Sequence, residues 1–292
     1  MNKIFLVISL LLVFCSPIEV HAKDAKKAIL IVSFGTSMPE SRKAIDNLVE
    51  AAKNNFPEIE TRLAFSSNII RRKIARENNE IIPTPVEALA KLNDEGFTHV
   101  YIVPTHIIPG EEYDEIKNVR DSFAELRGKY GFKKLALAKP FLSSVEDCDR
   151  MAEILCERFK KFLDENTAIV LMGHGTPKHI ANAMYSQLQL SLDKKSYGKF
   201  FLGTVEASPL IEDVIMKLKR HKEIKKLIIS PFMIVAGDHA NNDLADENDD
   251  ESWISILKLN GYENIEKYLV GLGEDENIKN DFVKKIRVLV NE

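Results

Sequence analysis

The stretch Ala28–Thr36, with the sequence AILIVSFGT, and the stretch Thr167–Thr176, with TAIVLMGHGT, decide the fold. Each begins with an apolar run and ends in a turn that contains glycine. Strands that are apolar on both faces are typical of parallel sheets covered by helices on both sides. The two stretches therefore predict two buried strands, each leading directly into a glycine-containing loop.

Segments with helical spacing alternate with short apolar runs along the rest of the chain. Ser41–Phe56 places Ala44, Leu48 and Ala52 on one face, as expected for a helix. The same reasoning predicts a helix over His179–Leu192 and a strand over Lys225–Val235. Strands that alternate with helices indicate βαβ units, so the chain is predicted to be an α/β protein with mostly parallel sheets.

The two halves of the chain resemble each other at the strand ends. Phe34-Gly35-Thr36 corresponds to His174-Gly175-Thr176, and HIIPGEEY at 106–113 corresponds to MIVAGDHA at 233–240. The pattern predicts two similar α/β halves, residues 23–140 and 141–292, each with a mostly parallel sheet flanked by helices. A cleft is expected between them, because ligands of such sheets bind beyond the carboxyl ends of the strands.

Composition excludes several classes of protein. The 292 residues are 45% hydrophobic and 29% charged, which is ordinary for a globular protein. The formal net charge is −4, whereas nucleic-acid-binding domains are usually basic, so no nucleic-acid partner is expected. Cys148 and Cys156 lie eight positions apart in one predicted helix, about 12 Å along its axis, and are expected to be free thiols.

The first 22 residues have the pattern of a secretory signal peptide. Lys3 supplies a positive charge, Ile4–Phe14 is an apolar run too short to span a bilayer, and Ala22 offers a small residue for cleavage. Cleavage after Ala22 predicts an exported, for example periplasmic, protein with no stable membrane insertion. An uncleaved anchor remains the alternative, and a lipoprotein site at Cys15 fits less well because bulky residues precede it.

Three ionisable residues follow successive strands of the second half. His174 lies in the GHGT turn, Glu206 follows the next strand, and His239 lies in AGDH after the third. Their spacings of 32 and 33 residues correspond to about one βαβ unit each, so the topology should bring them together at one edge of the sheet. Two imidazoles and a carboxylate suit a divalent transition metal, and they also suit acid–base chemistry.

Other polar residues indicate a functional site less specifically. His106 follows a strand end beside Glu111 and Glu112, and is a candidate substrate-binding residue. His179 and His221 are expected at exposed helix positions. The acidic run 243–251 fits a metal site or an exposed charged loop. The basic run 71–73 fits contacts with an acidic ligand or a solvated helix face, and no phosphate-binding fingerprint is present in the sequence.

From Lys27 to near its end the chain resembles the anaerobic, CbiK-type cobaltochelatases, which are class II chelatases. The resemblance lies in a set of segments spread along the chain. They are AILIVSFGTS at 28–37, AFSSNIIRRKI at 64–74, TPVEALAKL at 84–92, HIIPGEEYDEI at 106–116, VLMGHGT at 170–176, VEASP at 205–209, MIVAGDHANNDLADENDDESW at 233–253 and GLGE at 271–274.

The resemblance implies a role for individual residues. His174 and His239 match the metal-binding histidines, Glu206 matches the glutamate that joins them, and Glu112 matches a further acidic residue facing the cleft. The implied reaction is insertion of Co²⁺ into sirohydrochlorin, with a tetrapyrrole and a divalent metal as the partners. Arg71, Arg72 and Lys73 are candidates for binding the carboxylates of the substrate.

The resemblance implies no nucleotide cofactor and is compatible with a homo-oligomer. Fe²⁺ and Ni²⁺ suit the same ligands as Co²⁺, and the side chains that hold the metal can also accept pyrrole protons. The export signal keeps a second hypothesis open, because sirohydrochlorin is made in the cytoplasm. Under that hypothesis the protein binds a metal, haem or another tetrapyrrole in the periplasm and retains the chelatase fold.

Overall fold

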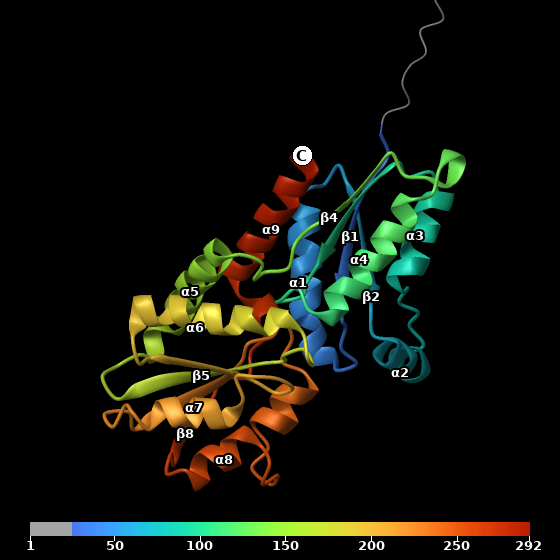
Figure 1. Ribbon diagram of the computed structural model, residues 1–292. Coiled ribbons are helices and arrows are strands. Elements are labelled where there is room, and N and C mark those ends of the chain that lie inside the picture. The colour runs from blue at the N-terminus through green and yellow to red at the C-terminus, as the bar shows by residue number, and fades with distance from the viewer. Residues whose placement is uncertain (1–24) are drawn as a thin grey trace, which may run out of the picture.

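The computed structural model describes residues 25–292, and the predicted signal peptide lies outside the described residues. The chain forms two four-stranded parallel sheets with helices on their faces (Figure 1). The first sheet has the order β2-β1-β3-β4 and the second β6-β5-β7-β8, so the two sheets share one topology. The predicted α/β fold with two similar parallel sheets is confirmed.

The strands of the first sheet are β1 (Lys27–Ser33), β2 (Glu60–Phe65), β3 (His99–Pro104) and β4 (Lys134–Leu137). Those of the second sheet are β5 (Thr167–Gly173), β6 (Phe200–Thr204), β7 (Lys226–Pro231) and β8 (Asn264–Lys267). The main helices before β5 are α1 (Pro39–Asn55), α2 (Asn68–Asn78), α3 (Pro85–Asp94), α4 (Glu111–Ala124) and α5 (Val145–Phe159). Those after β5 are α6 (Ala183–Ser196), α7 (Ile211–Leu218), α8 (Trp253–Leu259) and α9 (Glu276–Asn291).

The central strands are buried as their apolar sequences predict. Ala28–Val32 of β1 and Ala168–Val170 of β5 have no solvent exposure. Local signals set the helix ends: Thr84 and Glu87 form a reciprocal capping box at the start of α3, with Pro85 in the first turn. Each sheet therefore holds its strand ends, and the loops that follow them, on a rigid base.

Helix α9 joins the two halves. Although it follows β8 in sequence, it packs against α1 and β3 of the first sheet (Figure 1). Its apolar face carries Ile278, Phe282 and Ile286, and the Phe282 ring stacks on Phe141 at a centroid distance of 6.2 Å. One hydrophobic core thus extends through both halves. The division at residues 140 and 141 stays a prediction.

The bounds of two predicted elements are wrong: one strand ends earlier than predicted, and one helix begins later. The strand predicted over Lys225–Val235 ends at Pro231, because the chain turns away there and pairs by single main-chain bonds with Leu272 and Gly273. The helix predicted from His179 begins at Ala183, after a short 3₁₀ turn that the His179 imidazole caps by accepting the Ala181 N–H.

Other sequence expectations can be compared directly. His179 and His221 were expected to be exposed on helices, and this is wrong: their side chains are 23% and 15% exposed, and both residues lie outside the helices. Cys148 and Cys156 share α5 and are free thiols, as predicted. No helix within residues 25–292 is both long and apolar enough to cross a membrane.

Candidate active site

The second sheet brings three predicted residues together. His174 follows β5, Glu206 follows β6, and His239 lies in the loop after β7, and these three strands are neighbours in the sheet. The rings of His174 and His239 are 4.8 Å apart between centroids and nearly perpendicular. The His174 Nδ1 atom lies 3.7 Å from a carboxylate oxygen of Glu206. All three side chains remain about one-third exposed, so a ligand can reach them.

The Gly-His-Gly turn is shaped by close packing. A Cβ on Gly173 would come within 2.7 Å of the Tyr185 ring, and Gly175 has a φ of +86°, which favours glycine. The buried Tyr185 hydroxyl accepts a hydrogen bond from the Gly175 N–H at 3.4 Å. Asn182 bonds both main-chain groups of Thr176. The turn that carries His174 is therefore fixed by groups from α6 and the residue before it.

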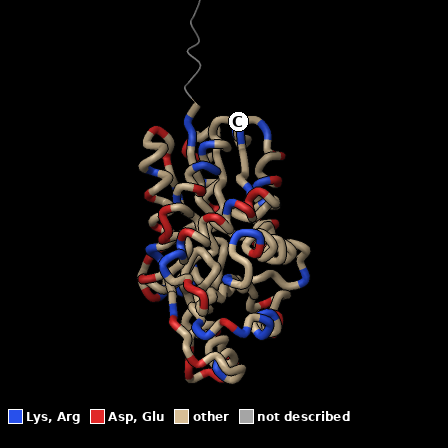
Figure 2. The backbone as a smooth tube through the Cα atoms, turned by 90° about the vertical axis from the view of Figure 1, so that its left-hand side faces the viewer, with Lys and Arg blue, Asp and Glu red and all other residues tan. Residues whose placement is uncertain are grey.

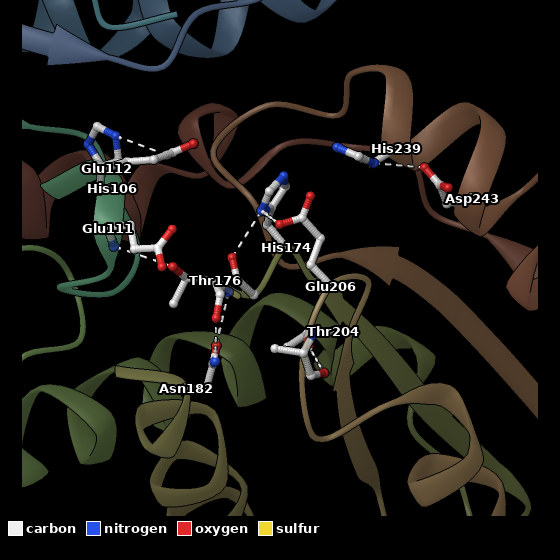
Figure 3. Close-up of polar contacts among 12 residues, drawn as sticks. His106, Glu111, Glu112, His174, Thr176, Asn182, Thr204, Glu206, His239 and Asp243 are labelled. Carbon is white, nitrogen blue, oxygen red and sulfur yellow. Dashed lines mark hydrogen bonds and ion pairs between the residues drawn. The ribbon is translucent and has the colours of Figure 1, made fainter. Parts of the chain in front are cut away.

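Both imidazoles are oriented by a partner at Nδ1. His239 Nδ1 is 2.7 Å from an Asp243 carboxylate oxygen, and His174 Nδ1 is 3.0 Å from the Gly175 carbonyl oxygen. Because a carbonyl or carboxylate oxygen can only accept, we infer that Nδ1 carries the proton in each ring. No bond to either Nε2 atom is formed within residues 25–292, and both lone pairs point into the space bordered by Glu206 (Figure 3). Such outer partners are typical of metal-binding histidines.

The three side chains do not yet surround a single point. Within residues 25–292, no three His, Cys, Asp or Glu side chains are close enough together to hold a metal ion. The donor types nevertheless fit a divalent transition metal, since two free imidazole nitrogens and one carboxylate are available on adjacent loops. Closing the set requires movement of side chains on these loops. The assignment of metal ligands stays a prediction.

A second pair of ionisable residues comes from the first sheet. His106 follows β3, Glu112 lies in the first turn of α4, and the His106 Nε2 atom is 3.3 Å from a Glu112 carboxylate oxygen (Figure 3). Burial of the Glu112 carboxyl opposes its ionisation, but the neighbouring His106 imidazole, and more weakly His174, hold the Glu112 pKa below its usual value. The Glu112 side chain is 42% exposed and points towards the His174 side of the site.

The two halves touch beside these groups. The Glu111 N–H donates to the Thr176 hydroxyl at 3.3 Å, and a His179 ring nitrogen lies 3.2 Å from an Asp114 carboxylate oxygen. A Cβ on Gly110 would come within 2.9 Å of the Thr176 side chain, so the loop before α4 approaches closely only because residue 110 is glycine. These contacts fix the position of Glu112 relative to His174.

The predicted basic residues lie elsewhere on the first half. Arg71 donates to the Ile82 carbonyl at 2.6 Å and pairs with Glu87 at 2.6 Å. Arg72 and Lys73 are exposed on α2. None of these three cations bonds a histidine of the site within the described part of the chain. In the view of Figure 2, basic and acidic residues alternate over both halves. The role of these cations in substrate binding stays a prediction.

A cavity lies away from the histidines. It has a volume of about 470 Å³ and is lined by the end of β4, α5 and α9, with Lys139, Arg150, Asp281 and Lys285 among its residues. None of the predicted site residues borders it. We place the candidate site at the strand ends, where the ionisable groups converge, because chemistry depends on donor groups more than on hollow volume.

The family model for cobalt chelatase (CbiK) matches residues 27–291, which is nearly all of the described chain. The chain belongs to the cobalt chelatase (CbiK) family. It is 32% identical over 269 residues to the sirohydrochlorin cobaltochelatase of Salmonella typhimurium, covering 91% of this chain and 97% of that protein. It is 31% identical over 241 residues to the sirohydrochlorin cobaltochelatase CbiKC of Nitratidesulfovibrio vulgaris, covering 82% and 83%.

Solved structures share the fold of this CbiK-family chain at lower identity. SirB from Bacillus subtilis with Fe³⁺ is 17% identical, with a TM-score of 0.59 and coverage of 90% of this chain and 94% of that one. CbiX, described as the terminal enzyme of siroheme biosynthesis in denitrifying bacteria, is 16% identical, with a TM-score of 0.55 and coverage of 89% and 98%. These likenesses establish the chelatase-like architecture of two similar halves.

The sequence did not predict several residues that support the site. Tyr185 and Asn182 hold the Gly-His-Gly turn and follow it within ten residues, but no local sequence pattern marks their side chains as its partners. Asp114 and His179 meet across the halves, and their contact was not predicted because they are 65 residues apart in the sequence. For Asp243 the sequence did contain a signal: it lies four residues after His239, and this spacing of about one helical turn indicates a contact between the two side chains.

Proposed function

We propose that this protein is a sirohydrochlorin cobaltochelatase, a lyase that inserts Co²⁺ into sirohydrochlorin in cobalamin biosynthesis. Membership of the CbiK family supports the activity. The observation that carries the assignment of the site is the pair of free Nε2 atoms, on His174 and His239, which point into one space beside Glu206. In this proposal these three side chains hold the metal substrate.

The three proposed ligands, His174, Glu206 and His239, can both bind the ion and release it to the substrate. Two neutral imidazoles and one carboxylate can replace part of the water shell of Co²⁺ while leaving coordination positions open. Pyrrole nitrogens of the substrate then take the open positions. Because Glu206 is 38% exposed and has no short bond to either histidine, it can move with the ion as the ring replaces protein ligands. Fe²⁺ and Ni²⁺ suit the same donors, so metal supply would influence the product.

The macrocycle must lie beside the ion for transfer to occur. Phe34, at the end of β1, is a large apolar side chain with 41% exposure and offers a surface for the ring. Sirohydrochlorin carries eight carboxylates, so cations beyond the edge of the site would contribute to binding. Arg72 and Lys73, which are exposed on α2, are the cations proposed for this, whereas the guanidinium of Arg71 is already paired with Glu87.

Export is a second part of the proposal. The first 22 residues have a signal-peptide pattern, so we propose cleavage after Ala22 and a periplasmic location. N-terminal sequencing of protein from the periplasmic fraction is expected to begin at Lys23. Recovery of the intact chain from the cytoplasm would contradict export without affecting the chelatase assignment.

The activity is tested by anaerobic metal insertion. The protein is mixed with sirohydrochlorin and Co²⁺, or with Fe²⁺, and the absorption spectrum is followed against a protein-free control. Acceleration with wild type and its loss in His174→Ala support the proposal, while His99→Ala, at the far end of β3, serves as the matched control. Stoichiometric bound haem or metal without acceleration would favour the periplasmic binding protein instead.

A further inference from the structure

The amino edge of the first sheet, at the opposite end of its strands from the proposed site, carries a cluster of lysines. Lys26 and Lys27 lie at the start of β1, and Lys133 and Lys134 lie at the start of β4. Thr98 joins the two pairs, because its N–H donates to the Lys26 carbonyl at 2.9 Å and its carbonyl accepts the Lys133 N–H at 2.8 Å. These four lysines form a basic edge on one short stretch of surface.

The charges of the basic edge are not balanced by carboxylates. Within residues 25–292 none of its four ammonium groups forms an ion pair, whereas at the amino edge of the second sheet Lys226 pairs with Glu266 at 2.7 Å. Glu95 lies beside Lys26, but its carboxylate pairs with Arg62. The Lys26 ammonium donates instead to the Glu95 main-chain oxygen at 2.9 Å. The positive charge therefore remains available to an anionic partner.

The imidazole of His99 shows how close these charges are to one another. Lys27 and Lys134 are its register neighbours on β1 and β4, so it lies between the two pairs of lysines. Burial first, and then the charges of three lysines of the basic edge, hold the His99 pKa below its usual value. These lysines are Lys27, Lys133 and Lys134. The basic edge thus has a positive potential that disfavours a further positive charge and favours an anion.

The loop between α4 and β4 adds apolar side chains next to the basic edge. Leu126 and Tyr130 are 42% and 59% exposed, and the Lys129 ammonium lies 4.7 Å from the centre of the Tyr130 ring. Asn93 of α3 holds the loop by donating to the Tyr130 carbonyl at 3.1 Å. Glu125 is the single acidic residue in the segment 125–134, which carries four cations. Exposed aromatic and aliphatic side chains among cations are typical of surfaces that lie in the headgroup region of a bilayer.

The sequence before the basic edge favours a membrane over a soluble polyanion as the partner. In the proposed export the apolar run Ile4–Phe14 enters the membrane, and only residues 15–25 separate it from Lys26. Cleavage after Ala22 would leave the Lys23 side chain and a new α-amino group as two further positive charges close to Lys26 in the sequence. The described chain starts at the outer end of the first half (Figure 1).

We propose that the basic edge and the loop at Tyr130 dock the protein on a bilayer that contains anionic phospholipids. The ammonium groups lie among the lipid phosphates, and the Leu126 and Tyr130 side chains enter the headgroup region. Each lysine near such a surface raises the affinity about fivefold, and salt weakens the attraction. The seven residues of β1 span about 20 Å, so the proposed site faces away from the bilayer and stays open to its substrate. Docking does not require the chelatase activity.

The docking surface is tested by binding to lipid vesicles. The chain Lys23–Glu292, which contains every described helix and strand, is mixed with vesicles of phosphatidylcholine alone or of phosphatidylcholine with phosphatidylglycerol. Sedimentation measures the bound protein. Binding is expected only to the vesicles that contain phosphatidylglycerol, and high salt should abolish it by screening the charges. Absence of binding, or equal binding to both kinds of vesicle, would overturn the proposal.

Two matched variants locate the binding surface. The first combines Lys27→Gln, Lys133→Gln and Lys134→Gln, and its affinity for the anionic vesicles should fall about 100-fold. The second removes the same number of charges from the amino edge of the second sheet and should bind nearly as well as the wild type. Its substitutions are Lys199→Gln, Lys225→Gln and Lys226→Gln. An equal loss in both variants would show that only net charge matters, and would overturn the assignment of the surface.

A fluorescence measurement tests the orientation on the bilayer. Trp253, the single tryptophan, is 4% exposed and lies in the second half, so its emission should not change when vesicles bind. Tyr130→Trp adds a tryptophan at the proposed contact, and the emission should shift to shorter wavelength with the anionic vesicles because the new ring leaves water. Vesicle-bound protein without this shift would contradict the proposed orientation.

Metal insertion separates this inference from the proposed function. Without vesicles, the variant that combines Lys27→Gln, Lys133→Gln and Lys134→Gln should insert Co²⁺ at the wild-type rate, because these residues lie at the far end of the sheet from the site. Anionic-vesicle binding by a protein that inserts no metal would support the docking surface and refute only the chelatase activity. Retention on immobilised heparin without vesicle binding would identify a soluble polyanion as the partner and overturn the lipid assignment.

Discussion

The two central strands of this protein end in the same turn but carry different side chains. Phe34-Gly35-Thr36 follows β1, and His174-Gly175-Thr176 follows β5, with φ of +105° and +86° at the two glycines. Main-chain bonds match as well: Ser67 N–H donates to the Phe34 carbonyl, and Glu206 N–H donates to the His174 carbonyl. The scaffold is therefore duplicated, whereas the proposed metal ligands occur in one copy only.

The same relation holds at the third strand of each sheet. Aligning HIIPGEEY with MIVAGDHA places His106 opposite Met233 and Glu112 opposite His239. Thr105 and Phe232, the residues before, make equivalent main-chain bonds to β1 and β5. Glu112 in the first half thus occupies the position that His239, a proposed metal ligand, occupies in the second half. The difference shows that strand topology determines where side chains meet, and residue identity determines what they do.

The largest loss of metal insertion is expected when the turn at His174 is given the sequence of the turn at Phe34. His174→Phe should reduce Co²⁺ insertion at least about 100-fold, because the proposed site loses an imidazole donor. Thermal unfolding should change little, since the His174 side chain is one-third exposed. The initial rate of insertion and the melting temperature measure the two effects. Wild-type turnover in this variant would remove His174 from the mechanism.

A smaller loss is expected when only the orientation of His239 is disturbed. Asp243→Asn keeps the size of the side chain but weakens the 2.7 Å contact that fixes Nδ1. Outer partners of this kind are worth about 10–100-fold in metal affinity. Titration with Co²⁺ should show the weakened affinity, with Asp249→Asn in the nearby acidic run as the control. Equal affinities in both variants would contradict the orienting role.

Alanine substitutions at Gly35 and Gly175 are expected to affect stability and activity to different degrees. Gly35→Ala forces a Cβ to within 2.5 Å of the Phe65 ring in addition to the unfavourable φ, and should cost about 3 kcal/mol of unfolding free energy. Gly175→Ala places a Cβ 3.0 Å from the Thr204 hydroxyl and 3.1 Å from the Ala207 main-chain nitrogen and should cost about 1–2 kcal/mol, but it displaces His174 and should slow insertion more. Denaturant unfolding ranks the two variants by stability, and the insertion rate ranks them by activity. If the same variant were the more impaired in both assays, the different roles of the two glycines would be contradicted.

The smallest effect concerns the contact between the halves. His179→Gln removes the pairing with Asp114, whose side chain is half-exposed, so the unfolding free energy should fall by no more than about 1 kcal/mol. Insertion should slow only slightly, because the Glu111–Thr176 bond still joins the halves. A loss of insertion as large as that of His174→Phe would place His179 in the catalytic machinery.

Local sequence was sufficient for the scaffold and for the loops that carry the site. Apolar runs ending in glycine located the turn at His174, and one βαβ unit of spacing placed Glu206 and His239 after the two strands that flank β5. Sequence did not predict that α9 crosses to β3, because this contact joins distant segments. It also did not predict that Tyr185 packs under the turn, because that contact depends on the orientation of a side chain. Nor could it predict the burial of His106 or the Nδ1 contact of His239, which depend on side-chain orientation.

The most direct measurement is transfer of a bound ion in a single turnover. The protein is loaded with one equivalent of Co²⁺ under anaerobic conditions, free ion is removed, and sirohydrochlorin is added with a chelator that binds released Co²⁺. If His174, Glu206 and His239 hold the ion that is inserted, cobalt-sirohydrochlorin should form despite the chelator in wild type and His99→Ala, and not in His174→Phe. Product that forms only when the chelator is omitted and free Co²⁺ is supplied would contradict the account.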